Sequence, residues 1–160
     1  MSKTDRFETL EISGEPVVEL DYQQMSLSVA YGLSGHTLPD GDLYALDKLQ
    51  SVWDDTVRKR VKQYTNAMIH RSSPMKRRPT EIEPLMVPEG SSEREVTAMT
   101  VREMILNKHK PIEAWFETGR GMELMFHESG ILMGVLEALM SEDIVGLPIH
   151  DALLVPVSEG

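Results

Sequence analysis

Two aspartate residues stand where short, largely apolar segments end. Asp21 follows residues 17–20, and Asp151 lies between the apolar runs 147–149 and 152–157. An unpaired buried carboxylate is costly, so each must be paired, exposed at a turn, or bound to a cation. A single aspartate at a hairpin bend commonly bonds its own backbone. Because two such aspartates occur on β-like segments, a second interpretation is that both carboxylates bind a divalent metal ion.

The chemistry that needs such a pair is metal-assisted phosphoryl transfer. Two ions about 3.5–4 Å apart can polarise the attacking and leaving oxygens together. Mg²⁺ (or Mn²⁺) takes oxygen ligands, including one or two carboxylates and the substrate phosphate. Asp21 and Asp151 can meet only if their strands are neighbours in one sheet. Arg58 and Lys62 are one helical turn apart and could face the phosphates. Each of these features alone is also common in proteins without catalysis.

The charges are unevenly distributed along the chain. Its net charge is −10, which argues against a general nucleic-acid binder. Residues 58–78, however, hold eight of the 16 basic residues and not one of the 26 acidic residues. Such a run is either a solvated basic helix and loop or a clamp for phosphates.

Length and composition set further limits. With 160 residues, the chain is expected to form a single domain, residues 1–160, with a real core. It has no cysteine, which excludes disulfides and thiolate metal sites. We find no apolar run approaching the roughly 20 residues of a membrane span and no secretory leader. The expectation is a cytoplasmic protein with no membrane partner.

The periodicity predicts an α+β fold. Strands are expected at residues 17–20 and in a C-terminal β-hairpin around Asp151. Asp42 is expected to cap a helix that runs or kinks onward into a basic helix. This helix and a proline-rich irregular segment occupy about residues 57–92. Ser91 or Ser92 is expected to cap the next helix. Residues 122–140 give the strongest helical pattern, and we expect its apolar stripe to pack under the sheet.

At this point three stretches, in order, resemble motifs A, B and C of family A (DNA polymerase I-like) DNA polymerases. They resemble the single-subunit phage-type RNA polymerases more distantly. The first family motif reads Asp-Tyr-Ser-Gln-Ile-Glu-Leu-Arg. Residues 21–28 match it at Asp21, Tyr22, Gln24 and Leu27.

The second family motif places Arg, Lys, Phe and Tyr at steps of four on one helix. Arg58 and Lys62 match it, while Asn66 and His70 stand at the two aromatic positions. The third motif is a Val-His-Asp-Glu hairpin, which residues 149–152 match as Ile-His-Asp-Ala. The resemblance spans about residues 14–157, with dense identity only in the first and third motifs.

The resemblance implies a palm-like fold: a small antiparallel sheet with the C-terminal hairpin, packed on several helices. It also implies roles for the site residues. Asp21 and Asp151 would be the catalytic residues and bind two Mg²⁺ ions, with the backbone carbonyl of Tyr22 as an added ligand. His150 would lie near the primer end. The nucleotide-binding residues would be Tyr22, Arg58, Lys62, Asn66 and His70.

The sequence departs from the family pattern at several positions. Ser26 replaces the glutamate that excludes a 2′-hydroxyl, and Ser28 replaces the arginine that closes the first motif. Asn66 lacks the aromatic surface for base stacking, which is worth about 1–3 kcal/mol on single-strand platforms. Ala152 replaces the glutamate after the catalytic aspartate. No segment corresponds to the thumb, so another chain or domain is expected to supply it.

Three interpretations follow. The first is a Mg²⁺-dependent nucleotidyltransferase, a minimal or partial nucleic-acid polymerase acting on nucleoside triphosphates and nucleic acid in replication. The second is a non-catalytic palm-like protein that binds nucleic acid or a replication partner. The third is an unrelated α+β domain whose aspartates only end strands. The sequence leaves open DNA or RNA product, template requirement, oligomeric state, and whether the chain is a fragment, a split subunit or an inactive relative.

Overall fold

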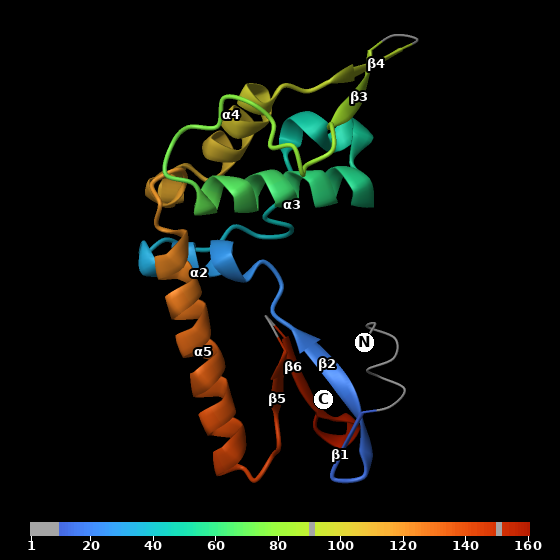
Figure 1. Ribbon diagram of the computed structural model, residues 1–160, viewed down its shortest axis with the longest axis vertical. Coiled ribbons are helices and arrows are strands. Elements are labelled where there is room, and N and C mark those ends of the chain that lie inside the picture. The colour runs from blue at the N-terminus through green and yellow to red at the C-terminus, as the bar shows by residue number, and fades with distance from the viewer. Residues whose placement is uncertain (1–9, 90–91, 150–151) are drawn as a thin grey trace. The chain divides into compact units, whose positions relative to one another are not determined.

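A computed structural model describes residues 10–89, 92–149 and 152–160 (Figure 1). The chain is mixed α+β, with a small antiparallel sheet whose C-terminal strands pack against helices. This confirms the predicted fold class. The chain divides into two compact units. Unit 1 comprises residues 1–26 and 126–160, and unit 2 comprises residues 27–125. Each unit is described by itself.

Unit 1 contains a four-stranded antiparallel sheet in the order β1-β2-β6-β5. Its strands are β1 (Glu11–Ile12), β2 (Glu15–Asp21), β5 (Leu147–Ile149) and β6 (Ala152–Pro156). The expected C-terminal hairpin is therefore present as the pair β5–β6. Central β6 is buried along its whole length. This explains why its sequence is continuously apolar rather than alternating, since both faces of the strand are covered.

The core of the sheet forms between strands from the two ends of the sequence. Ile12 and Val17 pack with Leu154 in one buried cluster, and Leu10 and Ile149 cover its edge. Fully burying one such aliphatic side chain stabilises the fold by about 1.5–3 kcal/mol. These contacts hold residues 10–21 against the C-terminal hairpin.

Helix α5 (Gly121–Ser141) forms where the sequence predicts it, but its apolar side chains are not a core. Only Gly121 and Leu124 are buried, whereas Phe126 and Met140 are 76% and 75% exposed. The expectation that the stripe packs under the sheet is therefore wrong. Periodicity reports that a helix has an apolar face; it does not report what covers that face.

Helix α5 also bears on the expectation of no membrane partner. By length and composition alone, this one helix among the described residues is long enough and apolar enough to cross a bilayer. It is not an uninterrupted apolar run, because Glu123, Glu128 and Glu137 divide it, and the expectation stays a prediction. Length and composition do not separate a membrane span from a helix that binds a partner.

Unit 2 is mainly helical. Its helices are α2 (Met25–Leu33, which begins in unit 1), the 3-10 helix η1 (Asp47–Val52), α3 (Asp55–His70), α4 (Ala98–Lys108) and the 3-10 helix η2 (Lys110–Trp115). A hairpin of β3 (Met86–Glu89) and β4 (Ser92–Glu95) precedes α4. Residues 71–85 between α3 and β3 contain neither helix nor strand, as the prolines predicted.

Two predicted helix starts are wrong. Asp54, not Asp42, caps α3, accepting a hydrogen bond from Val57 N at 2.8 Å. Asp42 instead accepts one from Tyr44 N, at 3.1 Å, in a local turn. Thr97 caps α4 in place of Ser91 or Ser92, since residues 92–95 form β4. Several residues that can cap compete in each stretch, and tertiary contacts decide among them.

Candidate functional site

Asp21 is the last residue of β2, and its side chain is exposed. The strand cannot continue, because the chain turns through Gln24, whose φ of 58° is left-handed, and α2 begins at Met25. Half-buried Tyr22 lies between strand and turn. The local sequence thus ends a strand with a carboxylate at the surface, as the first motif requires.

The ladder partner of Asp21 on β6 is Ala152. On the other side of β6, Ile149 pairs with Ala152. Strands β2 and β6 are therefore neighbours in one sheet, which is the arrangement that a two-carboxylate site requires. His150 and Asp151, the predicted primer-end residue and second metal ligand, lie outside the described residues. Their roles stay predictions.

A further carboxylate lies close to the first motif. Ser26, at the position of the family's glutamate, donates a hydrogen bond from Oγ to Glu128 Oε1 at 2.6 Å. Glu128 lies on α5, 102 residues further along the chain. Sequence reasoning missed this residue because nothing in the local pattern around it signals chemistry. Glu128 therefore places an acidic group beside Ser26.

The four predicted nucleotide-binding residues of the second motif follow one side of α3. Arg58, Lys62, Asn66 and His70 recur every four residues, so they share a helix face. Lys62, Asn66 and His70 are exposed. His70 closes this face against Gly121, where an added Cβ would lie 3.0 Å from the His70 Cα atom and would collide with the imidazole. A larger residue at position 121 would therefore have to displace the His70 ring.

Arg58 is already engaged. Its Nε and Nη2 atoms donate to the two carboxylate oxygens of Asp42, at 2.8 and 3.2 Å. Its guanidinium carbon also lies 5.4 Å from the ring centroid of Tyr44. A bidentate arginine–carboxylate pair is the geometry that a phosphate would also use. A phosphate that uses the Nε and Nη2 atoms of Arg58 must therefore displace Asp42, which does not occupy Nη1.

The other cations of residues 58–78 fall into two groups. Arg60 forms an ion pair with Glu83, and Arg78 forms one with Glu95 at 2.9 Å. Five further cations make no ion pair among the residues that the structure describes. Arg71 is half-buried, and the other four are exposed: Lys59, Lys62, Lys76 and Arg77. This segment therefore keeps a solvent-facing positive charge.

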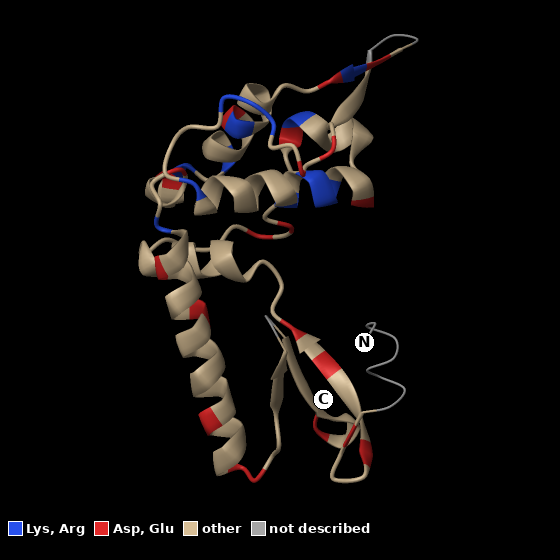
Figure 2. Ribbon diagram, in the orientation of Figure 1, with Lys and Arg blue, Asp and Glu red and all other residues tan. Residues whose placement is uncertain are grey.

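The predicted site residues belong to different units. Asp21 and Tyr22 lie in unit 1, and the basic face of α3 lies in unit 2. The described residues of unit 1 contain no lysine and no arginine, as the absence of blue along β2, β5 and β6 illustrates (Figure 2). Within the described ranges, no group of three or more His, Asp or Glu side chains is arranged to hold a metal ion.

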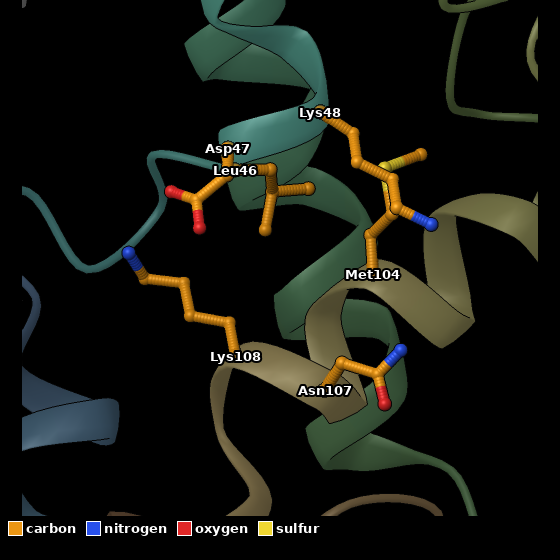
Figure 3. Close-up of a pocket in the computed structure, with 6 residues that line it drawn as sticks. All are labelled: Leu46, Asp47, Lys48, Met104, Asn107 and Lys108. Carbon is orange, nitrogen blue, oxygen red and sulfur yellow. The ribbon is translucent and has the colours of Figure 1, made fainter.

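Unit 2 also contains a cavity that sequence reasoning did not predict. It has a volume of about 370 Å³ and lies between η1 and α4 (Figure 3). Lys48 and Asp47 border it from the η1 side, and Met104, Asn107 and Lys108 border it from α4. Lys108 Nζ donates to the carbonyl oxygen of Ala45 at 2.6 Å. Since this bond fixes the ammonium group to the protein, we assign the cavity no ligand.

Comparison with known proteins adds no relative: no family model matches the chain, and neither a curated protein nor a solved structure is detectably similar to it.

Proposed function

We propose that the chain is a magnesium-dependent nucleotidyltransferase of palm type, acting on a nucleoside triphosphate and a nucleic-acid end. The observation that supports this most is the antiparallel register of β2 and β6, in which Asp21 is opposite Ala152. Asp151 precedes Ala152 in the chain, and consecutive Cα atoms are about 3.8 Å apart. That register puts Asp21 at the end of the sheet where β6 begins, which is what a site with carboxylates at positions 21 and 151 needs.

In this proposal different residues of the chain bind the metal ions and the triphosphate. Asp21, Asp151 and the Tyr22 carbonyl supply oxygen ligands of the kind that Mg²⁺ prefers. Bound Mg²⁺ would neutralise charge that develops on the phosphates. The resemblance assigns triphosphate binding to Arg58 and Lys62 of unit 2, and a phosphate at Nε and Nη2 of Arg58 would replace Asp42.

The reaction forms one P–O bond and breaks another. A 3′-hydroxyl oxygen attacks the α-phosphorus and releases its proton to water, the bond from the α-phosphorus to the bridging oxygen of the β-phosphate breaks, and pyrophosphate leaves. His150 would lie near the attacking end, while Asn66 and His70, on the same exposed face as Lys62, contact the nucleotide. Glu128, held by Ser26, is a further acidic group that can contact the sugar.

The test is incorporation of a labelled nucleotide with Mg²⁺ or Mn²⁺. Asp21→Asn and Asp151→Asn should each lower incorporation by a factor of about 100 or more, because each removes a charged ligand. Glu15→Gln removes an exposed carboxylate from the other end of β2 and should leave activity unchanged. Incorporation that survives both aspartate substitutions would contradict the proposal.

A second function is favoured by a different observation. Four exposed cations of residues 58–78 lack ion pairs with the described residues, and Arg58 is already held by Asp42. This favours a palm-like protein that binds nucleic acid without turnover. Binding of a single-stranded oligonucleotide should weaken with salt, and Lys76→Gln with Arg77→Gln should reduce both the affinity and the salt slope. If the oligonucleotide affinity and its salt slope are unchanged by these substitutions, this function is excluded.

A further inference from the structure

Helix α5 presents an exposed apolar seam within unit 1. Its members are Phe126, Met133, Leu136 and Met140, with Ser129 completing a spacing of three, four, three and four residues. This alternation is the pattern by which one helix packs along another. Phe126, Met133 and Met140 are 76%, 56% and 75% exposed, and Leu136 is half-buried. The seam is therefore uncovered within the described chain.

The seam ends in a cavity of about 460 Å³. Met133, Leu136 and Met140 form one wall, and Ile144, Val145 and Gly146 form the other. The helix stops here because Asp143 adopts a left-handed φ of 61° and Ile144 N donates to Leu139 O at 2.9 Å. This reversal brings residues 144–146 back beside the helix and creates a pocket for one aliphatic side chain.

Acidic groups border the seam and its cavity. Glu137 is one helical turn from both Met133 and Met140, and Glu137 and Asp143 both line the cavity. Nine acidic residues and no basic residue occur in the described part of unit 1. An occupant of the seam must therefore satisfy an apolar face and supply cations at its edges.

These observations decide among the occupants. A second copy of the chain that docks seam against seam would bring acidic edges against acidic edges, and like-charge juxtaposition opposes such contacts. A cellular bilayer surface is itself anionic, and it attracts basic rather than acidic helices. Nucleic acid is excluded as an occupant of the seam because its phosphates are also anionic. A helix with leucine-like residues on one face and Lys or Arg beside them fits both the seam and its charge.

We propose that the α5 seam and its terminal cavity bind a cationic amphipathic helix of a partner protein. An aliphatic side chain of the partner fills the cavity, and its Lys or Arg side chains pair with Glu137 and Asp143. The inference stands apart from the proposed chemistry, since no seam residue is a predicted site residue.

The experiment uses the full chain and two fluorescent peptides of about 18 residues, long enough to cover the seam as helices. One peptide combines leucine with lysine in an amphipathic helical order, and the other has glutamate in place of every lysine. Fluorescence anisotropy should show binding of the lysine peptide that weakens with salt, and no binding of the glutamate peptide. Equal binding of the two would overturn the proposal.

Variants separate seam binding from general attraction to an acidic surface. Met133→Ser with Met140→Ser should weaken the lysine peptide about tenfold or more, as loss of central anchors does. Ile131→Ser, an exposed apolar residue of α5 outside the seam, should have no effect. Glu137→Gln should weaken binding at low salt, whereas Glu142→Gln should weaken it less. Circular dichroism checks that each variant keeps its helix content.

Three other results would contradict the proposal. If Ile131→Ser weakens the peptide as much as the seam substitutions, the seam is not the binding surface. Concentration-dependent dimerisation that Met140→Ser abolishes would assign the seam to a second copy of the chain. Seam-dependent binding to vesicles of phosphatidylcholine and phosphatidylglycerol would assign it to a membrane.

Discussion

The two units carry very different charge. Residues 27–125 contain 14 acidic and 14 basic side chains, so unit 2 is neutral. Unit 1 contains 12 acidic and two basic side chains and therefore holds the entire net charge of −10. In unit 2 several charges pair internally, as Arg58 does with Asp42 and Arg102 with Glu117. The described residues of unit 1 include no lysine and no arginine, and most of its described carboxylates are exposed.

Acidic residues therefore have different structural roles in the two units. In unit 2 a carboxylate can be part of the core: Glu117 is buried and accepts hydrogen bonds from Arg102 and from Met75 N. In unit 1 they define what can approach the surface. The expectation of a positive segment on a negative body thus takes a sharper form, with the negative excess confined to one unit.

The largest effect should follow from breaking the buried pair of unit 2. Glu117→Ala leaves the Arg102 guanidinium and the Met75 amide without their carboxylate, which lies 2.7 Å from Arg102 Nη2 and 2.6 Å from Met75 N. Loss of one partner of a fully buried pair costs about 3–5 kcal/mol, and we expect the low end here because the Arg102 side chain is 27% exposed. Urea unfolding measures this cost. Glu15→Ala, in unit 1, is the control and should change the stability by less than about 0.5 kcal/mol.

A somewhat smaller effect should follow from acid. Burial lowers the pKa of His109 from 6.5 to about 4, while its ring contacts Tyr31 Oη at 3.1 Å and Leu43 O at 3.0 Å. The unfolded chain binds a proton near pH 6.5 and the folded chain does not, so stability falls as pH drops from 6.5 towards 4. The loss is about 3 kcal/mol over this window.

The measurement is urea unfolding at a series of pH values. His36→Gln, which removes an exposed histidine of the same unit, should keep the slope. His109→Gln should flatten it, even though the variant is less stable at every pH. A slope that persists in His109→Gln would assign the pH dependence to other groups.

The smallest effect should come from reversing one charge in unit 1. Glu15→Lys places the first cation among the described carboxylates of that unit and relieves self-repulsion. Stability should rise by a few tenths of a kcal/mol at low salt, and added salt should remove the gain. Thermal unfolding at two salt concentrations tests this. No gain at low salt would mean that these carboxylates are too far apart to repel each other.

The sequence predicts local elements well where pattern and chemistry agree. The strand before Asp21, the C-terminal hairpin, the basic helix and the helix of residues 121–141 were all expected. Alternation, β-branched residues and four-residue spacing are local signals, so a single sequence carries them. The pairing of the strands that hold Asp21 and Ala152 is a different matter, because the two-carboxylate hypothesis required it and no local signal encodes it.

What the sequence did not reveal depends on long-range contacts. The bond between Ser26 and Glu128 joins residues 102 positions apart, and no local pattern encodes it. The local sequence predicts that Asp42 caps a helix, but in the structure Asp42 forms an ion pair with Arg58. The stripe of α5 reads as core, because exposed and buried apolar faces have the same period. Each of these depends on what lies opposite a side chain.

A substitution at Gly121 can alter the orientation of His70 on α3 without changing any residue of that helix. The three atoms nearest to an added Cβ at position 121 all belong to His70. A larger residue there would therefore tilt the His70 imidazole and leave the identities of the other exposed α3 residues unchanged. Tolerance at position 121 therefore reports how finely the orientation of that imidazole matters. If a variant at position 121 keeps full nucleotide incorporation, His70 contributes packing rather than nucleotide contact.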